Sequence, residues 1–285
     1  MDPLPVYRIV ALSDIHCGDP RFDSKLLTSA IDEINRLGPD FVVIGGDLTA
    51  DGYREQFLAA KEYLDLIDCP HKVVVPGNHD CRNVGYLHFE DLFGPRYASL
   101  SFPFGVCCGT SIQENIRVLA ADSTKPDLND GEIGRDHYQW IEENFPDSGD
   151  FKLFILHHHL VSVPGTGRER NIVWDAGDVL AVLNKASVDL VLCGHKHVPH
   201  IWQVGDLLLI NSGTAGTHRT RGFSTPSYSL VDIRAERIDV SIITPGEPGF
   251  KIESFLRPKA FPDLKRMMAE TTREVEGRSP PEDAV

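Results

Sequence analysis

The sequence predicts an α/β protein built around a largely parallel β-sheet. Short apolar runs alternate along the chain with segments of helical periodicity, which is the pattern of strand–helix–strand units. Each apolar run leads into a polar loop rich in Gly, Asp and His. The chain has 285 residues, 41% of them hydrophobic, which is enough for one large domain with a sizeable core.

Three strand-then-helix units open the chain. Strands are expected over residues 7–12, 41–44 and 72–75, because these runs are apolar and rich in β-branched residues. A helix is expected over residues 25–37, where apolar residues recur at helical spacing and Gly38-Pro39 follows. A second helix is expected over residues 57–67. Three such units in a row favour a parallel sheet.

The second half repeats the pattern and then changes. Strands are expected over residues 116–121, 153–156 and 190–192, and helices over 135–145 and 176–185. Four further strands, over 201–204, 207–211, 227–234 and 237–243, are separated by turn residues, which indicates an antiparallel finish. We therefore expect one domain over residues 1–258, a helical extension over 259–276, and a disordered tail over 277–285, which is rich in Pro and acidic residues.

The charge balance favours a small-molecule substrate. Lys and Arg total 28 against 42 Asp and Glu, and the net charge of −14 repels a nucleic-acid backbone unless a local basic patch exists. The first residues lack the features of a secretory signal, and no run reaches the ~20 apolar residues of a membrane helix. The six Cys form no CxxC pairs, so reduced cysteines and a cytoplasmic protein without membrane partners are predicted.

Candidate ligands follow the ends of the predicted strands. Because parallel strands end at the same edge of a sheet, side chains far apart in sequence should converge there. Their carboxylate, imidazole and amide groups suit divalent Mn, Fe or Zn. Taken alone, each motif has an ordinary explanation as a turn or a cap, but their joint occurrence at strand ends favours a shared site. The candidates are Asp14, His16, Asp47, Asn78, His79, His157, His195 and His197.

These motifs resemble those of the calcineurin-like metallophosphoesterases. The resemblance covers residues 7–213 and rests on five segments: Asp14-Ile15-His16, Gly46-Asp47, Gly77-Asn78-His79-Asp80, His157, and Gly194-His195-Lys196-His197. It implies that residues 1–258 form a four-layer αββα sandwich, in which two mixed sheets are flanked by helices. It also implies a site for two divalent metal ions at one edge of the sheets.

The resemblance assigns a role to each residue. Asp14, His16 and His197 would hold one ion, Asn78, His157 and His195 would hold the other, and Asp47 would bridge both. A protonated His79 would assist the leaving group, and Asp80 would orient either His79 or the nearby backbone. His158 and His159 are expected to pack around the site rather than to bind metal.

A closer resemblance links the chain to bacterial class III cyclic nucleotide phosphodiesterases and to glycerophosphodiesterases. It rests on the His triplet at 157–159, on Gly131-Glu132-Ile133 before a helix that carries Trp140, and on the helix start at Asp175. It implies hydrolysis of a small phosphodiester by a metal-bound hydroxide, with a 3',5'-cyclic nucleotide as one candidate. Leu160 and Asp175 depart from the pattern, because Pro is usual after the His run and Asn is usual near Asp175.

The residues that bind substrate are less well defined by the sequence. Arg168 and Arg170, in the loop after the His triplet, could pair with a phosphate, and a solvated loop explains them equally well. The basic segment 218–222 is interpreted as a polar hairpin turn. A nuclease or RNA-end phosphodiesterase would need a basic channel through these two segments. A non-catalytic scaffold is disfavoured because each ligand position of the motifs carries the residue that the family pattern requires. A homo-oligomer is compatible with the sequence.

Overall fold

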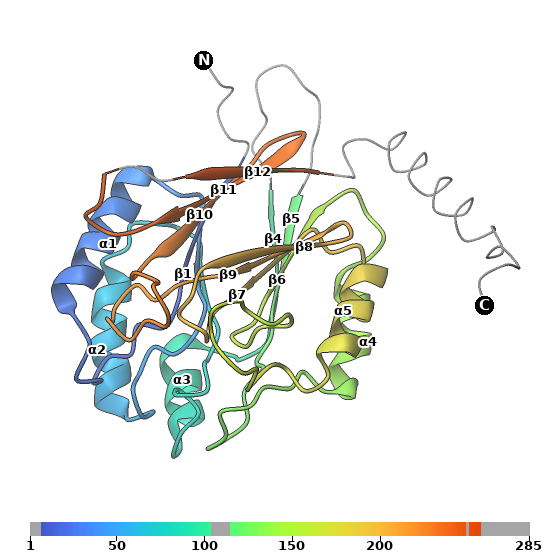
Figure 1. The fold of residues 1–285 in the computed structure, drawn as a ribbon. Helices are drawn as coiled ribbons and strands as arrows, with labels where there is room; N and C mark the ends of the chain where they lie inside the picture. The colour runs from blue at the N-terminus through green and yellow to red at the C-terminus, as the bar shows by residue number, and fades with distance from the viewer. Residues whose placement is uncertain (1–6, 104–114, 249–250, 258–285) are drawn as a thin grey trace, which may run out of the picture.

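Two six-stranded sheets pack face to face and carry helices on their outer faces, as the computed structural model shows (Figure 1). The structure describes residues 7–103, 115–248 and 251–257. The predicted four-layer αββα architecture with two mixed sheets is confirmed.

The first sheet has the order β12-β11-β10-β1-β2-β3. Its parallel part is β1 (Tyr7–Leu12), β2 (Phe41–Ile44) and β3 (Lys72–Val74). The strands β10 (Tyr228–Ile233), β11 (Arg237–Ile243) and β12 (Ile252–Leu256) extend it antiparallel from β1. The first three strands therefore end at one edge, as predicted.

The second sheet has the order β4-β5-β6-β7-β9-β8. The strands β5 (Asn115–Ala120), β6 (Phe151–Ile155), β7 (Leu190–Cys193) and β9 (Leu207–Asn211) are parallel. The edge strands β4 (Ala98–Pro103) and β8 (His200–Val204) are antiparallel to their neighbours. The prediction of a wholly antiparallel finish is thus wrong for β9, because the β8–β9 hairpin returns the chain alongside β7.

Three hydrophobic layers hold these elements together. Alternate residues of β1 illustrate this: Ile9 and Ala11 face the second sheet, and Val10 and Leu12 face the helices. The helices α1 (Ser24–Leu37), α2 (Arg54–Asp65) and α3 (Gly85–Phe93) lie on the outer side of the first sheet (Figure 1). The helices α4 (Tyr138–Asn144) and α5 (Ala176–Lys185) cover the second sheet.

Three elements were not predicted, and each has a weak sequence pattern. The helix α3 is nine residues long, starts at Gly85 and buries only Gly85 and Phe89. The strands β4 and β12 are edge strands, and β12 is mostly exposed, so neither shows a run of buried residues. A short 3-10 turn, η1 (Arg135–His137), also precedes α4 where one continuous helix was expected.

Two predicted regions, the helical extension over 259–276 and the disordered tail over 277–285, lie outside the described residues. Within the described residues, none of the helices combines the length and the hydropathy needed to cross a membrane.

Candidate metal centre

The structure brings all seven predicted ligand residues together at one edge of the two sheets. They lie just after the ends of β1, β2 and β3 in the first sheet and of β6 and β7 in the second. All seven side chains are buried: Asp14, His16, Asp47, Asn78, His157, His195 and His197. Such burial of polar groups is costly unless they are paired or bind an ion.

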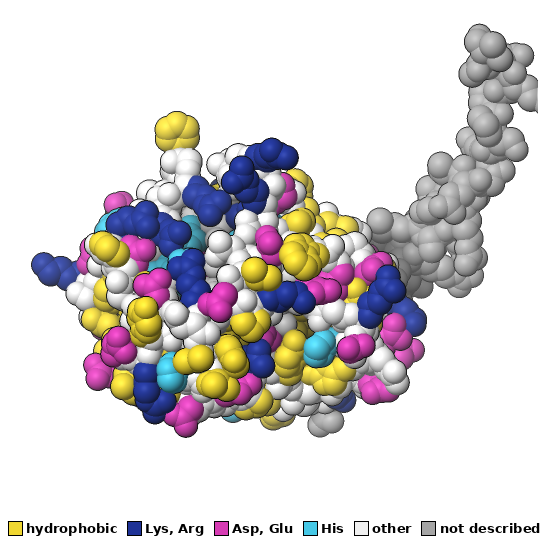
Figure 2. Space-filling model, turned by 90° about the horizontal axis from the view of Figure 1, so that it is seen from below, with side chains coloured by type: hydrophobic (Ala, Val, Ile, Leu, Met, Phe, Trp, Pro, Cys, Tyr) yellow, Lys and Arg dark blue, Asp and Glu magenta, His cyan; other side chains and the backbone are white. Residues whose placement is uncertain are grey.

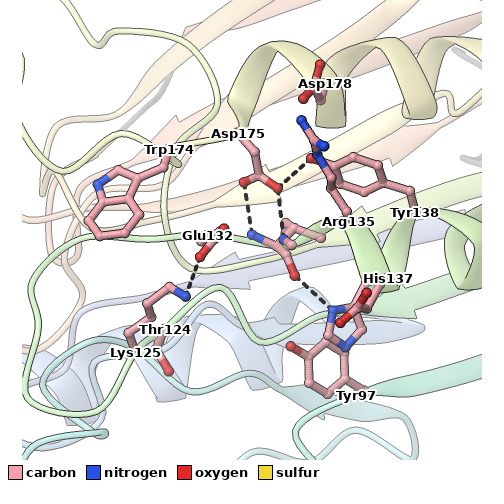
Figure 3. Close-up of a pocket in the computed structure, with 13 residues that line it drawn as sticks. Tyr97, Thr124, Lys125, Glu132, Arg135, His137, Tyr138, Trp174, Asp175 and Asp178 are labelled. Atoms are coloured by element: carbon pink, nitrogen blue, oxygen red, sulfur yellow. Dashed lines mark hydrogen bonds and ion pairs between the residues drawn. The ribbon is translucent and has the colours of Figure 1, made fainter.

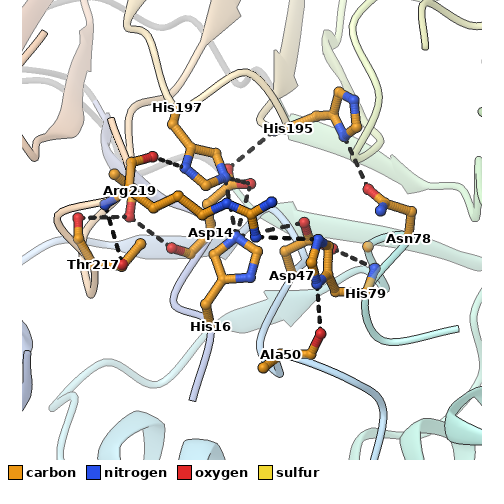
Figure 4. Close-up of polar contacts among 12 residues, drawn as sticks. Asp14, His16, Asp47, Ala50, Asn78, His79, His195, His197, Thr217 and Arg219 are labelled. Carbon is orange, nitrogen blue, oxygen red and sulfur yellow. Dashed lines mark hydrogen bonds and ion pairs between the residues drawn. The ribbon is translucent and has the colours of Figure 1, made fainter. Parts of the chain in front are cut away.

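A first cluster contains Asp14, His16, Asp47 and His197 (Figure 4). Its ligand atoms all lie within 4.8 Å of one another. The Nε2 atoms of His16 and His197 are 3.0 Å apart, and His197 Nε2 lies 3.0 Å from Asp14 Oδ1. Two carboxylates and two imidazoles thus point at one small volume.

A second cluster lies beside the first. Asn78 Oδ1 is 2.9 Å from His195 Nδ1 and 3.3 Å from His157 Nε2. Asp47 links the clusters, because its Oδ2 lies 3.7 Å from His16 Nε2 and 3.5 Å from His157 Nε2. The candidate residues therefore form two adjacent groups with Asp47 between them, and the assignment of each group to one ion stays a prediction.

His158 lies close to the second cluster but is held elsewhere. A ligand atom of His158 lies within 4.8 Å of those of His157 and His195. However, its Nδ1 is 2.9 Å from Ser123 Oγ and its Nε2 is 3.2 Å from the carbonyl oxygen of Asn129. Both ring nitrogens are therefore engaged, and we do not count His158 among the candidate ligands.

Backbone carbonyls fix which nitrogen of two candidate ligands faces the site. His157 Nδ1 lies 2.7 Å from the carbonyl oxygen of Gly45, and His197 Nδ1 contacts the carbonyl oxygen of Arg219. A carbonyl oxygen only accepts hydrogen bonds, so Nδ1 carries the hydrogen in both rings. The lone pair of each Nε2 then points into the cluster, as metal binding requires.

Unusual backbone conformations accompany the candidate ligands. Asp14, His16, Asp47, His195 and His197 all have positive φ, between 52° and 73°. This region costs non-glycine residues about 1 kcal/mol or more and is concentrated at functional sites. The strain turns each side chain sharply into the space beyond the strand ends.

Two glycines of the sequence motifs give these loops room to approach one another. A Cβ on Gly46, whose φ is +91°, would lie 2.7 Å from Gly77 N. A Cβ on Gly77 would lie 2.2 Å from the backbone nitrogen of Asp47. Both positions therefore exclude any larger residue, which explains why Gly precedes Asp47 and Asn78.

Burial keeps two of the histidines neutral. It lowers the pKa of His16 to about 3 and that of His195 well below its usual value. At His157 burial also lowers the pKa, but the charge of Asp47 outweighs it and raises the pKa to about 9. The site thus offers neutral imidazoles and, beside Asp47, a point that attracts positive charge.

The donor set fits a divalent cation. Asp14 Oδ1 and His16 Nδ1 are buried and have no hydrogen-bond partner among the described residues. Unpaired buried polar atoms are rare in proteins, and a cation bound at Asp14 would satisfy its oxygen. Carboxylate, imidazole and amide donors without a thiol are typical of Mn, Fe and Zn sites.

His79 contacts the cavity beside the clusters. Its Nδ1 lies 2.5 Å from the carbonyl oxygen of Ala50, so its Nε2 faces the opening. Burial lowers the pKa of His79, and Arg82 and Arg219 lower it further, although Asp47 acts in the opposite direction. These effects lower the affinity of His79 for a proton, and the expected proton donation to the leaving group stays a prediction.

Asp80 holds the backbone of the site. Its buried carboxylate accepts hydrogen bonds from the amides of Leu48, Thr49 and Gly77, at 2.9–3.1 Å, and from Thr49 Oγ1 at 2.8 Å. Of the two expected roles, the contacts correspond to orientation of the backbone. Asp80 thereby fixes the two loops that carry Asp47 and Asn78.

The family model of the calcineurin-like phosphoesterases matches residues 7–199, which is more than half of the chain. The chain belongs to the calcineurin-like phosphoesterases. The matched segment contains all seven candidate ligands, both glycines of the loops and His79. The predicted family is confirmed.

Two curated relatives are phosphodiesterases by name. The chain is 27% identical over 165 residues to a probable cyclic nucleotide phosphodiesterase of Synechococcus, across 58% of this chain and 60% of the relative. It is 31% identical over 192 residues to a probable glycerophosphodiester phosphodiesterase of Arcobacter nitrofigilis, across 61% and 63%. The chain thus spans less than two thirds of the length of either relative.

The fold also matches that of a solved protein. A dimetal phosphatase from Danio rerio superposes with a TM-score of 0.67 at 15% identity, over 89% of this chain and 99% of the other. At this identity the match establishes the architecture alone.

The arginines at the cavity beside the two clusters are not those that the sequence suggested. Arg168 and Arg170 are exposed and are absent from the described residues that line the cavity. The cavity holds about 140 Å³, and on this face Lys and Arg side chains gather around a hollow with visible histidines (Figure 2). Besides Asp47, Asn78, His79, His195 and His197, it is lined by Arg82, Asn129, Asn171, Arg219 and Arg221.

Asn129 was also missed, because no motif marks it. Its Oδ1 accepts hydrogen bonds from Asn78 Nδ2 at 3.1 Å and from Arg82 Nη2 at 3.3 Å. The first bond turns the amide of Asn78 so that its oxygen faces His195 and His157. Asn129 thus has the position of an orienting residue for a candidate ligand.

Asp175 does not lie at the candidate metal centre. It accepts hydrogen bonds from the amides of Ile133 and Gly134 and from the Tyr138 hydroxyl at 2.6 Å (Figure 3). It lines a separate cavity of about 690 Å³, which shares no lining residue with the cavity at the clusters. A carboxylate at this position is therefore explained by local structure.

An ion pair between a buried lysine and a half-buried glutamate ties the loop after the His triplet to the GHKH motif. Lys196, which is 1% exposed, lies 2.9 Å from Glu169 Oε1 and donates to the carbonyl oxygen of Arg170 at 2.6 Å. Glu169 also contacts His159 Nε2 at 2.9 Å.

Replacing Lys196 by methionine is expected to lower the free energy of unfolding by about 3 kcal/mol, because Glu169 would lose its partner in a partly buried place. Urea denaturation in EDTA, which separates folding from metal binding, measures this loss. Lys185→Met is the matched control, since that lysine is 70% exposed and pairs with Glu142, so about 0.5 kcal/mol or less is expected. Equal stabilities of the two variants would contradict a structural role for this ion pair.

Proposed function

We propose that this chain is a two-metal phosphodiesterase that hydrolyses a small phosphodiester. One observation carries the proposal: two ligand clusters lie side by side, and the carboxylate of Asp47 faces both, at 3.7 Å from His16 Nε2 and 3.5 Å from His157 Nε2. Two divalent ions in such a site would act as Lewis acids, lower the pKa of a bound water and stabilise charge on the phosphoryl oxygens.

Different residues of the chain would bind the ions, position the loops and contact the leaving group. Asp14, His16 and His197 would hold one ion and Asn78, His157 and His195 the other, with Asp47 shared. Asp80 keeps the loops of Asp47 and Asn78 in register through the hydrogen bonds to their backbones. His79 is fixed by Ala50, and its Nε2 is the ring atom placed to contact the leaving oxygen.

The cavity supports a small, polar substrate. The names of the relatives suggest two classes, cyclic nucleotides and glycerophosphodiesters. Every described residue that lines the cavity is polar or charged, so the cavity offers a nucleobase little apolar surface. A polar diester of the glycerophosphodiester kind therefore suits the cavity better than a cyclic nucleotide.

The proposal is tested by hydrolysis of bis(p-nitrophenyl) phosphate and p-nitrophenyl phosphate by the full chain, with Mn²⁺ and with EDTA. We expect metal-dependent cleavage that favours the diester and disappears in EDTA. Cleavage that persists in EDTA, or a strong preference for the monoester, would contradict a two-metal phosphodiesterase. A panel of Mn²⁺, Fe²⁺ and Zn²⁺ would then rank the metals, which the donor set alone does not distinguish.

A further inference from the structure

Two guanidinium groups converge on His79 from different loops. Arg82 lies in the same loop as Asn78, and its Nη2 is 3.2 Å from His79 Nε2. Arg219 comes from the segment between β9 and β10, and its Nη1 lies 3.4 Å from the same nitrogen (Figure 4). We call Arg82 and Arg219 the arginine bracket.

The bracket has more hydrogen-bond donors than His79 can use. His79 Nδ1 faces the carbonyl oxygen of Ala50, so Nε2 offers one lone pair to two guanidinium groups. Arg82 has other partners, since its Nη1 lies 3.1 Å from the Ala50 carbonyl oxygen and 3.3 Å from Asp51 Oδ1.

Arg219 is less well partnered. Besides His79, its guanidinium approaches Asp19 Oδ2 at 3.7 Å, beyond hydrogen-bond distance. Asp19 already accepts hydrogen bonds from Arg21, from the backbone amide at 2.8 Å and from Nε at 3.1 Å. Among the described residues, Arg219 therefore has one long ion pair, to Asp19, and no carboxylate within hydrogen-bond distance.

The local charge is opposite to that of the whole chain. Arg82, Arg219 and Arg221 all line the cavity, whereas the net charge of the protein is −14. Asp47 is the only acidic side chain among the described lining residues, and it belongs to the proposed metal centre. Three guanidinium groups beside a metal centre exceed what one phosphodiester, with a single negative charge, requires.

We propose that the arginine bracket binds a second anionic group, which the leaving group of the substrate carries. The substrate class is then a small phosphodiester with a phosphate or carboxylate close to the scissile bond on the side of His79. Guanidinium groups bind both anions through paired hydrogen bonds. This inference rests on the proposed function, because that function places the reacting phosphoryl group at the metal centre.

Binding of two non-hydrolysable ligands tests the bracket without turnover. Phenylphosphonate carries one anionic group, and 4-phosphonobenzoate adds a carboxylate on the other side of the ring. Calorimetry of the Mn²⁺-loaded protein should show roughly 10- to 100-fold tighter binding of 4-phosphonobenzoate, as a charge-assisted hydrogen bond provides. A third ligand, in which a second phosphonate replaces the carboxylate, shows by its affinity whether the bracket prefers a phosphate-like group to a carboxylate.

Arg219→Gln should abolish the difference in affinity between the two phosphonates, because it removes the charge. The substitution leaves in place the backbone carbonyl of residue 219, which contacts His197. Lys185→Gln removes one charge from an exposed position at the end of α5 and should preserve the difference. Arg219→Lys should restore it in part, since lysine keeps the charge without the planar fork. Circular dichroism of each variant checks that it is folded.

Two chromogenic diesters that differ only in a carboxylate on the nitrophenolate leaving group extend the test to catalysis. The carboxylated diester should have the higher kcat/KM in the wild-type protein, and Arg219→Gln should reduce that advantage. Equal binding of both phosphonates by the wild-type protein would overturn the inference, while hydrolysis of bis(p-nitrophenyl) phosphate would leave the proposed function intact. A carboxylate-dependent difference in binding without hydrolysis of any ester would support the bracket and contradict the proposed function.

Discussion

Replacing Asp47 by alanine is expected to abolish both metal binding and metal-dependent hydrolysis. Asp47 Oδ2 is the atom that faces both clusters, so its loss removes a ligand from each. Loss of a residue that only orients a ligand typically costs 10- to 100-fold in affinity or activity. Loss of a shared ligand should therefore reduce kcat/KM by more than about a thousandfold.

The measurement is the metal content of the purified variant together with its activity on bis(p-nitrophenyl) phosphate. Asp47→Asn separates the loss of the negative charge from the loss of a hydrogen bond. Asparagine keeps an oxygen that can accept from the backbone amide of His79, which lies 2.8 Å from Asp47 Oδ1 in the wild-type protein. Asp65→Ala, at an exposed carboxylate on α2, controls for the loss of one charge. Two bound metals and normal turnover in Asp47→Ala would show that the assignment of the centre is wrong.

Replacing His79 by alanine is expected to preserve the metals and to lose turnover, most strongly with poor leaving groups. None of the contacts that define the two clusters involves the His79 ring, and its Nε2 faces the cavity. Proton donation by a positioned side chain contributes typically 10²- to 10⁴-fold. Negative charge on the leaving oxygen would favour a proton on Nε2, against the lowering of its pKa by burial.

A series of aryl diesters with leaving groups of increasing pKa measures this dependence. If His79 donates a proton, the ratio of wild-type to variant rates should rise along the series. A ratio that stays constant would instead mean that His79 only holds Arg82 and Arg219 in place. His88→Ala is the matched control, because His88 lies in α3 and is absent from the described lining of the cavity.

The sequence predicted that the candidate ligands converge at one edge of the sheets, because strand ends are easy to recognise. The runs at 7–12, 41–44 and 190–192 are apolar and end abruptly, so the positions of Asp14, Asp47 and His195 follow from the geometry of a parallel sheet. The division of ligands between two ions came from the family resemblance. It depends on loop conformations that periodicity does not encode.

The substrate side was harder to predict for a physical reason. In the loop after the His triplet, Glu169 turns inward to Lys196 and His159, which leaves its neighbours Arg168 and Arg170 exposed. A half-buried carboxylate within a basic segment thus decided which side chains face solvent. The segment that carries Arg219 had been interpreted as a hairpin turn, and only the tertiary structure shows that it returns to His79.

The edge where the two sheets meet has a consequence for how the protein is made. Each cluster combines residues of both sheets: His16 and His197 are 181 positions apart, and Asn78 and His195 are 117 apart. A chain emerging from the ribosome therefore presents Asp14, His16, Asp47 and Asn78 long before the histidines that complete either set. Metal capture should be a late event, which follows the docking of the second sheet and locks it to the first.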